Sequence, residues 1–148
     1  MGNTTGVNFD ALSIHRIQWE DTISLRHSVL WPNKDPSFCF VQGDQDAFHY
    51  GAYVNSELVS VASIYIDKTS ARLRKFATNS IYQGKGIGSC MIRYIIADLQ
   101  QQNIILLWCD ARETARHFYE RLGMSVCSER FYKSEIAYLK MSKHLTRS

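Results

Sequence analysis

The sequence has no long apolar run, no closely spaced pair of cysteines and no cluster of basic residues. No apolar segment approaches the roughly 20 residues that a helix needs to cross a bilayer, and residues 1–10 lack the charged and then apolar pattern of a signal peptide. The four cysteines lie far apart without a CxxC pair, so neither a zinc site nor a redox pair is indicated. These absences predict a soluble, cytoplasmic protein with no metal and no membrane partner.

The charge is small and spread along the chain. The 17 Lys and Arg residues outnumber the 14 Asp and Glu residues, for a net charge of +3, and no Lys- or Arg-rich run is present. Because nucleic-acid-binding domains usually gather their basic residues into a patch, we do not expect nucleic acid as a partner. The content of 45% hydrophobic and 21% charged residues is typical of globular domains and argues against disorder or a fibre.

Apolar periodicity predicts a mixed α/β protein. Seven runs of strand character lie at residues 13–18, 48–54, 58–66, 72–78, 104–109, 125–132 and 136–142. Helical spacing predicts helices at residues 22–30 and 89–99, and a third helix that begins at a capping box of Asp110 and Glu113 and ends at Gly123. No repeat or linker divides the chain, so we expect one domain whose sheet has helices on both faces.

Residues 83–88, Gln-Gly-Lys-Gly-Ile-Gly, join the expected strand at 72–78 to the expected helix at 89–99. Glycine lets a ligand approach the backbone closely, and the first turn of a helix presents N–H groups that suit a phosphate. The spacing of a nucleotide P-loop is absent. A dinucleotide fingerprint would need a third glycine where Ser89 stands, and it would follow a βαβ unit instead of a hairpin. The segment therefore predicts a phosphorylated cofactor.

Two segments resemble motifs of a known family. Gln83-x-x-Gly86-x-Gly88 resembles the Q/R-x-x-G-x-G/A signature of the GNAT acetyltransferases, and residues 116–124 resemble that family's F-Y-E-x-L-G-F segment. The expected order of elements also matches, so the resemblance covers nearly the whole chain. It implies one N-acetyltransferase-like domain over residues 1–148, with a mostly antiparallel sheet of about seven strands, and transfer of an acetyl group from acetyl-CoA to a primary amine.

The resemblance also implies where acetyl-CoA binds. The strand before the glycines would offer backbone groups to the pantetheine arm, and the glycine segment would hold the pyrophosphate on its N–H groups. The cofactor-binding residues implied in this way are Phe76, Ala77, Thr78, Gln83, Gly84, Lys85, Gly86, Ile87, Gly88 and Ser89. Lys85 can add a cation or be an ordinary solvated lysine.

By the same resemblance, Tyr119 matches the tyrosine that serves as general acid for the departing thiolate; the alternative is a core tyrosine with a hydrogen-bonded hydroxyl. Cys109 has no adjacent histidine, which favours direct attack in a ternary complex over an acetyl-enzyme. The general base is open, because residues 72–75 carry cations where many relatives place a carboxylate. The remaining candidates, besides a water relay, are Glu135, Asp67, His27, His49 and Asp110.

The acceptor is the least determined part. By family analogy residues 25–48 form the acceptor side, with Arg26, His27 and Trp31 as candidate substrate-binding residues. Arg72 and Arg74 fit an acceptor with a carboxylate or phosphate, or a solvated strand face. We expect a small-molecule amine, and we keep a catalytically inactive CoA-binding module and a nucleotide-dependent oxidoreductase as alternatives. The oligomeric state is open, with a homodimer among the choices.

Overall fold

The computed structural model describes residues 11–146. Its strands are β1 (Leu12–Ile17), β2 (Phe48–Val54), β3 (Glu57–Asp67), β4 (Ser70–Thr78), β5 (Leu106–Arg112), β6 (Ser125–Val126), β7 (Phe131–Lys133) and β8 (Ile136–His144). Its helical segments are η2 (Trp19–Thr22), α1 (Ile23–Leu25), η3 (Arg26–Leu30), η4 (Pro36–Cys39), η5 (Asp44–Asp46), η6 (Ser80–Tyr82), α2 (Ile87–Gln101), η7 (Glu113–Ala115) and α3 (Arg116–Arg121). None of these helices is long and apolar enough to span a membrane.

All eight strands belong to one sheet. Their order is β1-β2-β3-β4-β5-β8-β6, and β7 pairs with β8 beside this path. Every pair is antiparallel except β4 and β5, which run parallel. The predicted α/β fold with a mostly antiparallel sheet is therefore confirmed.

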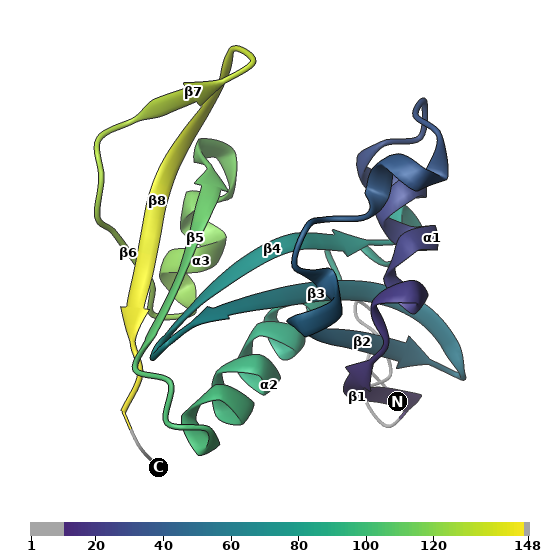
Figure 1. Cartoon of the computed structure of the whole chain (residues 1–148), viewed down its shortest axis with the longest axis horizontal. Coiled ribbons are helices and arrows are strands. Elements are labelled where there is room, and N and C mark those ends of the chain that lie inside the picture. The colour runs from purple at the N-terminus through teal and green to yellow at the C-terminus, as the bar shows by residue number, and fades with distance from the viewer. Residues whose placement is uncertain (1–10, 147–148) are drawn as a thin grey trace.

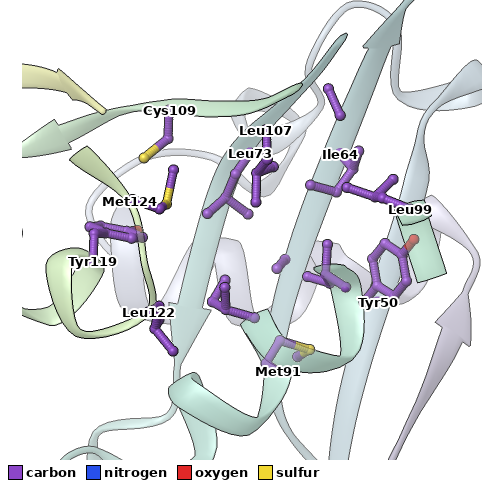
Figure 2. Packing of buried hydrophobic residues seen from close by; sticks show 14 of the residues in the cluster. Tyr50, Ile64, Leu73, Met91, Leu99, Leu107, Cys109, Tyr119, Leu122 and Met124 are labelled. Carbon is purple, nitrogen blue, oxygen red and sulfur yellow. The ribbon is translucent and has the colours of Figure 1, made fainter. Parts of the chain in front are cut away.

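Helical segments cover both faces of this sheet. On one face, the apolar stripe of α2 is buried, with Ile87, Met91, Ile95 and Leu99 all at most 1% exposed. This stripe belongs to the main core, which also takes in residues of the strands and of α3 (Figure 2). On the other face, a smaller cluster joins Leu25 of α1 to residues of β3 and β4. The sheet is thus enclosed by apolar packing on both sides, as its continuous apolar strands require.

The two central strands stay together over only a short length. The parallel pairing of β4 and β5 covers three residue pairs, from Ser70 with Leu106 to Arg72 with Trp108. Beyond this point β4 continues to Thr78 and β5 to Arg112, and Figure 1 shows the two strands diverging. One edge of β4 is therefore left without a strand partner from residue 73 onward.

The helix expected at residues 22–30 is irregular. A 3-10 turn (η2), one short α-helical turn (α1) and a π-helical segment (η3) follow one another along residues 19–30. The N–H of Trp31 closes this segment by donating to the carbonyls of Arg26 and His27, at 3.3 and 3.1 Å. A buried arginine, Arg26, lies in the middle of the segment, which explains why an apolar stripe alone did not describe it.

The capping box predicted at Asp110 and Glu113 is wrong. Asp110 lies inside β5, because the pairing with β8 continues past it to Arg112 and Tyr138. The residue before α3 is Ala115, with no side-chain cap, and the Glu113 carboxylate instead binds Arg130. Strand pairing with a distant segment has overridden the local pattern.

The end of α3 follows the prediction. Gly123 adopts a left-handed φ of 93°, and its N–H donates to the carbonyl of Glu120 at 3.0 Å.

The strand expected at residues 125–132 is interrupted, however, and forms the short strands β6 and β7. Between them, the Ser128 hydroxyl accepts a hydrogen bond from the Lys140 N–H at 2.9 Å, which replaces a regular ladder.

Candidate functional site

Two adjoining cavities lie where β4 and β5 diverge. The first, which we call the glycine-loop cavity, encloses about 590 Å³ between the end of β4, the glycine segment and α3. The second, which we call the strand-gap cavity, encloses about 420 Å³ between β4, β5, the β7–β8 hairpin and the end of η3. Both volumes suit small ligands. Phe76, Ala115 and Tyr119 line both cavities and mark the place where they meet.

The structure brings most of the predicted cofactor-binding residues together. Those that line the glycine-loop cavity are Phe76, Ala77, Thr78, Gln83, Gly84, Gly86, Ile87, Gly88 and Ser89. Lys85 is exposed and does not line it. Arg121 also lines this cavity and was not predicted, although it lies inside the segment that resembles the family's second motif.

Backbone N–H groups dominate the wall at the start of α2. Gly84 and Gly86 both have left-handed φ values, 75° and 87°, which turn the loop back toward the helix. The first helical N–H that bonds back along the chain belongs to Cys90, which donates to the Gly86 carbonyl at 3.2 Å. Within residues 11–146, the N–H groups of residues 84–89 have no acceptor. Together with the positive end of the helix dipole they form an anion site.

The first residue of the glycine motif ties this loop to β4. The side-chain amide of Gln83 donates to the Thr78 carbonyl at 2.9 Å, so the loop returns to the end of the strand that precedes it. At Gly88, a Cβ atom would lie 3.2 Å from the ring of Phe76 and 3.4 Å from that of Phe118. Glycine at this position therefore lets α2 approach both aromatic rings.

A bulge shapes the free edge of β4. Val61 pairs with Ala77 and Ser63 pairs with Arg74, so two residues of β4, Lys75 and Phe76, face a single residue of β3. Lys75 adopts a left-handed φ of 55°, which is unusual for a residue with a side chain. The bulge changes the direction of β4 where the edge that faces β5 has no strand partner. Such bulges occur often beside active sites.

Tyr119 lies at the junction of the two cavities. The residue is 9% exposed, and its ring packs beside Cys109 and Met124 (Figure 2). Burial raises the pKa of its hydroxyl far above the usual value, and the nearby Cys109 thiol adds to the effect. None of the hydrogen bonds among residues 11–146 uses this hydroxyl. It is thus a protonated phenol that is free to donate to a group in either cavity.

The thiol of Cys109 is buried and has low reactivity. Its side chain is 2% exposed, and burial, followed by the charge of Asp110, raises its pKa to about 12. A thiol in this state carries almost no thiolate near neutral pH, and the thiolate is the nucleophilic form. The structure therefore supports the expectation that this cysteine takes no acetyl group.

The five candidate bases differ in their position relative to the two cavities. His27 bonds the Lys34 carbonyl at 2.7 Å, and Glu135 and Asp67 are exposed in or beside turns; none of the three lines either of the two cavities described above. His49 is buried with both ring nitrogens hydrogen-bonded, to Ser63 and to the Asp44 carbonyl, and burial lowers its pKa. The remaining candidate, Asp110, lines the strand-gap cavity.

Among the residues described, only one of the two carboxylate oxygens of Asp110 has hydrogen-bond partners. Its Oδ2 atom accepts from Arg72 at 3.0 Å and from Lys133 at 3.1 Å, whereas its buried Oδ1 atom has no partner within residues 11–146. A buried carboxylate oxygen without a partner is costly, and in native proteins such groups often serve a ligand. Asp110 can therefore accept a hydrogen bond from a molecule in the strand-gap cavity.

The predicted acceptor residues do not stay together. Trp31 lines the strand-gap cavity, but His27 does not. Arg26 is fully buried and binds the Asp44 carboxylate at 2.7 Å, so its guanidinium is not available to a ligand. Residues of the β7–β8 hairpin, Lys133 and Tyr138, take part instead, and no motif in the sequence marks them. In the part of the chain described, no three His, Cys, Asp or Glu side chains gather as a metal site would need.

Comparison with known proteins gives a consistent result. A family model described as acetyltransferase (GNAT) domain matches residues 39–145. The uncharacterized N-acetyltransferase YitI of Bacillus subtilis (strain 168) is 29% identical over 129 residues, which cover 81% of this chain and 87% of that protein.

Solved structures share the fold. The ribosomal-protein-S18-alanine N-acetyltransferase from Escherichia coli aligns with a TM-score of 0.77 at 16% identity, over 93% of this chain and 96% of that one. A GNAT family acetyltransferase from Elizabethkingia anophelis, with acetyl-CoA bound, aligns with a TM-score of 0.71 at 16% identity, over 92% and 99%. With the family model covering most of its length and both sequence motifs placed around one site, this chain belongs to the GNAT acetyltransferase family.

Proposed function

We propose that the protein transfers the acetyl group of acetyl-CoA to the primary amine of a small molecule, by direct attack in a ternary complex. The observation that carries the proposal is the position of Tyr119, which lines both cavities and whose hydroxyl has no hydrogen-bond partner within residues 11–146. One cavity has the backbone features of a phosphate site, and the other has charged side chains suited to a polar acceptor. A donor in the first and an acceptor in the second would meet at this hydroxyl.

The donor side uses mainly backbone groups. The N–H groups of residues 84–89 would hold the pyrophosphate of CoA, with Arg121 as a nearby cation. Each hydrogen bond to a charged group contributes about 1.5–3 kcal/mol, so several together can anchor the ligand. The unpaired edge of β4 would hold the pantetheine arm, and its N–H groups near Phe76 would polarise the thioester carbonyl. Acetyl-CoA supplies an activated acyl group on a good leaving group.

The remaining steps are proton transfers. The acceptor amine must lose a proton to attack, since a free alkylamine has a pKa near 10.4. Asp110 Oδ1 would accept a hydrogen bond from this amine, directly or through water, and so orient it. The nitrogen would form the new bond to the acyl carbon and release its surplus proton to water. As the carbon–sulfur bond breaks, Tyr119 would donate its proton to the departing sulfur as a general acid, and its phenolate would then recover a proton from water.

A single substitution tests this assignment. Tyr119→Phe removes the hydroxyl and keeps the ring, so we expect kcat for thiol release to fall about 100-fold while acetyl-CoA binds with unchanged Kd. The matched control is Tyr132→Phe, which removes the hydroxyl of an exposed tyrosine on β7 that lines neither cavity. Turnover is measured on a panel of amines, and binding by calorimetry.

Two results would contradict the proposal. Unchanged turnover and unchanged pH dependence in Tyr119→Phe would remove the general acid from the mechanism. Tight binding of acetyl-CoA without acetylation of any amine would instead favour a CoA-binding module that has lost catalysis. Binding of NAD(P)H without binding of CoA would favour an oxidoreductase.

A further inference from the structure

The lining of the strand-gap cavity is strongly and unevenly charged. It contains the five basic residues Arg72, Arg74, Lys75, Arg112 and Lys133, and one acidic residue, Asp110. We propose that the acceptor carries a carboxylate or phosphate group in addition to its amine, and that Arg74 and Lys75 bind this anionic group. The inference rests on the proposed function, because it names the class of acceptor for the same site.

Most of this positive charge has no ion-pair partner within residues 11–146. Arg72 and Lys133 share one oxygen of Asp110, at 3.0 and 3.1 Å. Within residues 11–146, no carboxylate lies within 4 Å of the charged groups of Arg74, Lys75 or Arg112. A wall with this charge attracts anions and raises their local concentration.

The cations also repel one another. Burial, followed by the charges of Arg74, Arg26, Lys133 and Arg72, lowers the pKa of Lys75 to about 8. Burial and the charge of Arg72 likewise lower the pKa of Arg74. Like charges held this close destabilise the empty cavity, and a bound anion would relieve that repulsion.

Aromatic rings hold the two proposed anion-binding cations in place. The Lys75 ammonium lies 4.3 Å from the centre of the Trp31 ring, and the Arg74 guanidinium lies 5.6 Å from the centre of the Tyr65 ring. Cation–π contacts of this kind limit the freedom of long side chains. The cations are therefore partly ordered before a ligand arrives, which lowers the entropic cost of binding.

The position of this pair fits an acceptor that is acidic at one end and basic at the other. Arg74 and Lys75 line the strand-gap cavity, and this cavity meets the glycine-loop cavity at Phe76 and Tyr119, so an anion bound there shares its cavity with the junction. The unpartnered Oδ1 atom of Asp110 offers an acceptor for the amine of the same molecule. A volume of about 420 Å³ suits a small molecule, so we favour a small amino acid or amino phosphate over an acidic peptide.

The test compares amines that carry an anionic group with neutral analogues that lack it. With saturating acetyl-CoA, thiol release is measured for 4-aminobutanoate against 4-aminobutanamide and for 2-aminoethyl phosphate against 2-aminoethanol. We expect kcat/KM at least about tenfold higher for one acidic member, and the better pair identifies carboxylate or phosphate. Arg74→Gln with Lys75→Gln should reduce the preference to about twofold or less. Arg93→Gln, an exposed arginine on α2 that lines neither cavity, should leave it unchanged.

A binding measurement makes the result independent of turnover. Saturating CoA occupies the N–H groups of the glycine loop, and the complex is then titrated with succinate and with inorganic phosphate in a calorimeter. We expect the double variant to bind the preferred anion at least about tenfold more weakly than the unchanged protein and Arg93→Gln. Thermal unfolding of the double variant checks that it is folded.

The outcomes separate the two proposals. Equal kcat/KM for acidic and neutral amines, or equal anion binding in the double variant, overturns the acidic acceptor while acetyl transfer stands. Faster acetylation of acidic hexapeptides than of any small amine overturns the small-molecule class. If CoA binds but no amine is acetylated, the proposed function fails and the anion titration alone decides whether the cationic wall binds anions. If CoA does not bind either, the same titration is performed on the free protein.

Discussion

The two cavities that meet at Tyr119 are built from different parts of the chain. Residues of one continuous segment, 76–89, make most of the lining of the glycine-loop cavity. Residues from four separate segments line the strand-gap cavity: the end of η3, β4, the stretch from β5 to η7, and the β7–β8 hairpin. Backbone N–H groups of one segment can bind a phosphate without any charged side chain. A site made of distant side chains can change its ligand by single substitutions.

The acceptor side also depends on a buried polar network. The Asp44 carboxylate accepts hydrogen bonds from Arg26, from the Tyr65 hydroxyl and from the Val41 N–H. Arg26 bonds the Cys39 carbonyl as well, so the network fixes the loop at residues 33–47 against β3. A buried charge that loses its partner is strongly destabilising.

The largest expected effect breaks this network. Asp44→Asn leaves the Arg26 guanidinium buried without its counter-ion, so the free energy of unfolding should fall by about 3 kcal/mol in urea denaturation. Replacing both members, Arg26→Met with Asp44→Leu, should recover much of the loss. The control Glu120→Gln, in an exposed pair with Arg116, should cost about 0.5 kcal/mol or less. A loss at Asp44 as small as the control would show that the acceptor loop does not depend on the pair.

The next effect concerns the donor side. In Gly88→Val, the new Cβ would lie 3.2 Å from the Phe76 ring, and its methyl groups would enter the glycine-loop cavity. We expect the Kd for acetyl-CoA to rise about 100-fold, equal to about 2.7 kcal/mol. Ala97→Val, which introduces the same side chain on the exposed face of α2, should leave the Kd unchanged. Equal affinity in Gly88→Val would place the donor elsewhere.

A smaller effect depends on pH and belongs to the acceptor side. Lys75 binds an anion only when it is protonated, and its pKa of about 8 in the empty cavity lies well below the usual lysine value. Succinate stays fully ionised between pH 7 and 9.5, so its affinity for the CoA complex should fall about fivefold as pH rises through this range. Lys75→Arg should remove most of the fall, since arginine stays charged. A flat profile in the unchanged protein would exclude Lys75 from the anion site.

The smallest effect is expected at Cys109, which lines only the strand-gap cavity. Cys109→Ala should leave kcat within about twofold, because the neutral thiol takes no part in direct attack. Mass spectrometry of the protein mixed with acetyl-CoA should find no acetyl group on this cysteine. A large loss of kcat together with an acetylated Cys109 in the unchanged protein would replace direct attack by a two-step transfer.

The proposed donor site is easier to recognise in the sequence than the proposed acceptor site, for a physical reason. The glycine segment, the strand before it and the helix after it are all local, so Gly86, Gly88 and the apolar stripe of α2 can be recognised without knowing the fold. Asp110 looked like a helix cap in its local sequence, but its pairing with Lys140 on β8 keeps it in a strand. A cytoplasmic location and the oligomeric state stay predictions.

The acceptor side depends on partners far along the chain. Arg26 was expected to face a ligand, but Asp44 lies 18 residues later and holds it in the interior. Lys133 reaches the cavity only because β7 folds back on β8. Composition and periodicity carry no information about such pairs, so these residues are found only in the folded structure.

Because the pairing between β4 and β5 is short, a bound acetyl-CoA molecule would also have a structural role. Three residue pairs are all that couple strands β1 to β4 with strands β5 to β8 through the sheet. A pantetheine arm bonded to the open edge of β4 and packed against α3 would act as a surrogate strand across the opening. Donor binding would then be coupled to the association of the two halves of the sheet. Unfolding of the acetyl-CoA complex should therefore be more cooperative than unfolding of the free protein.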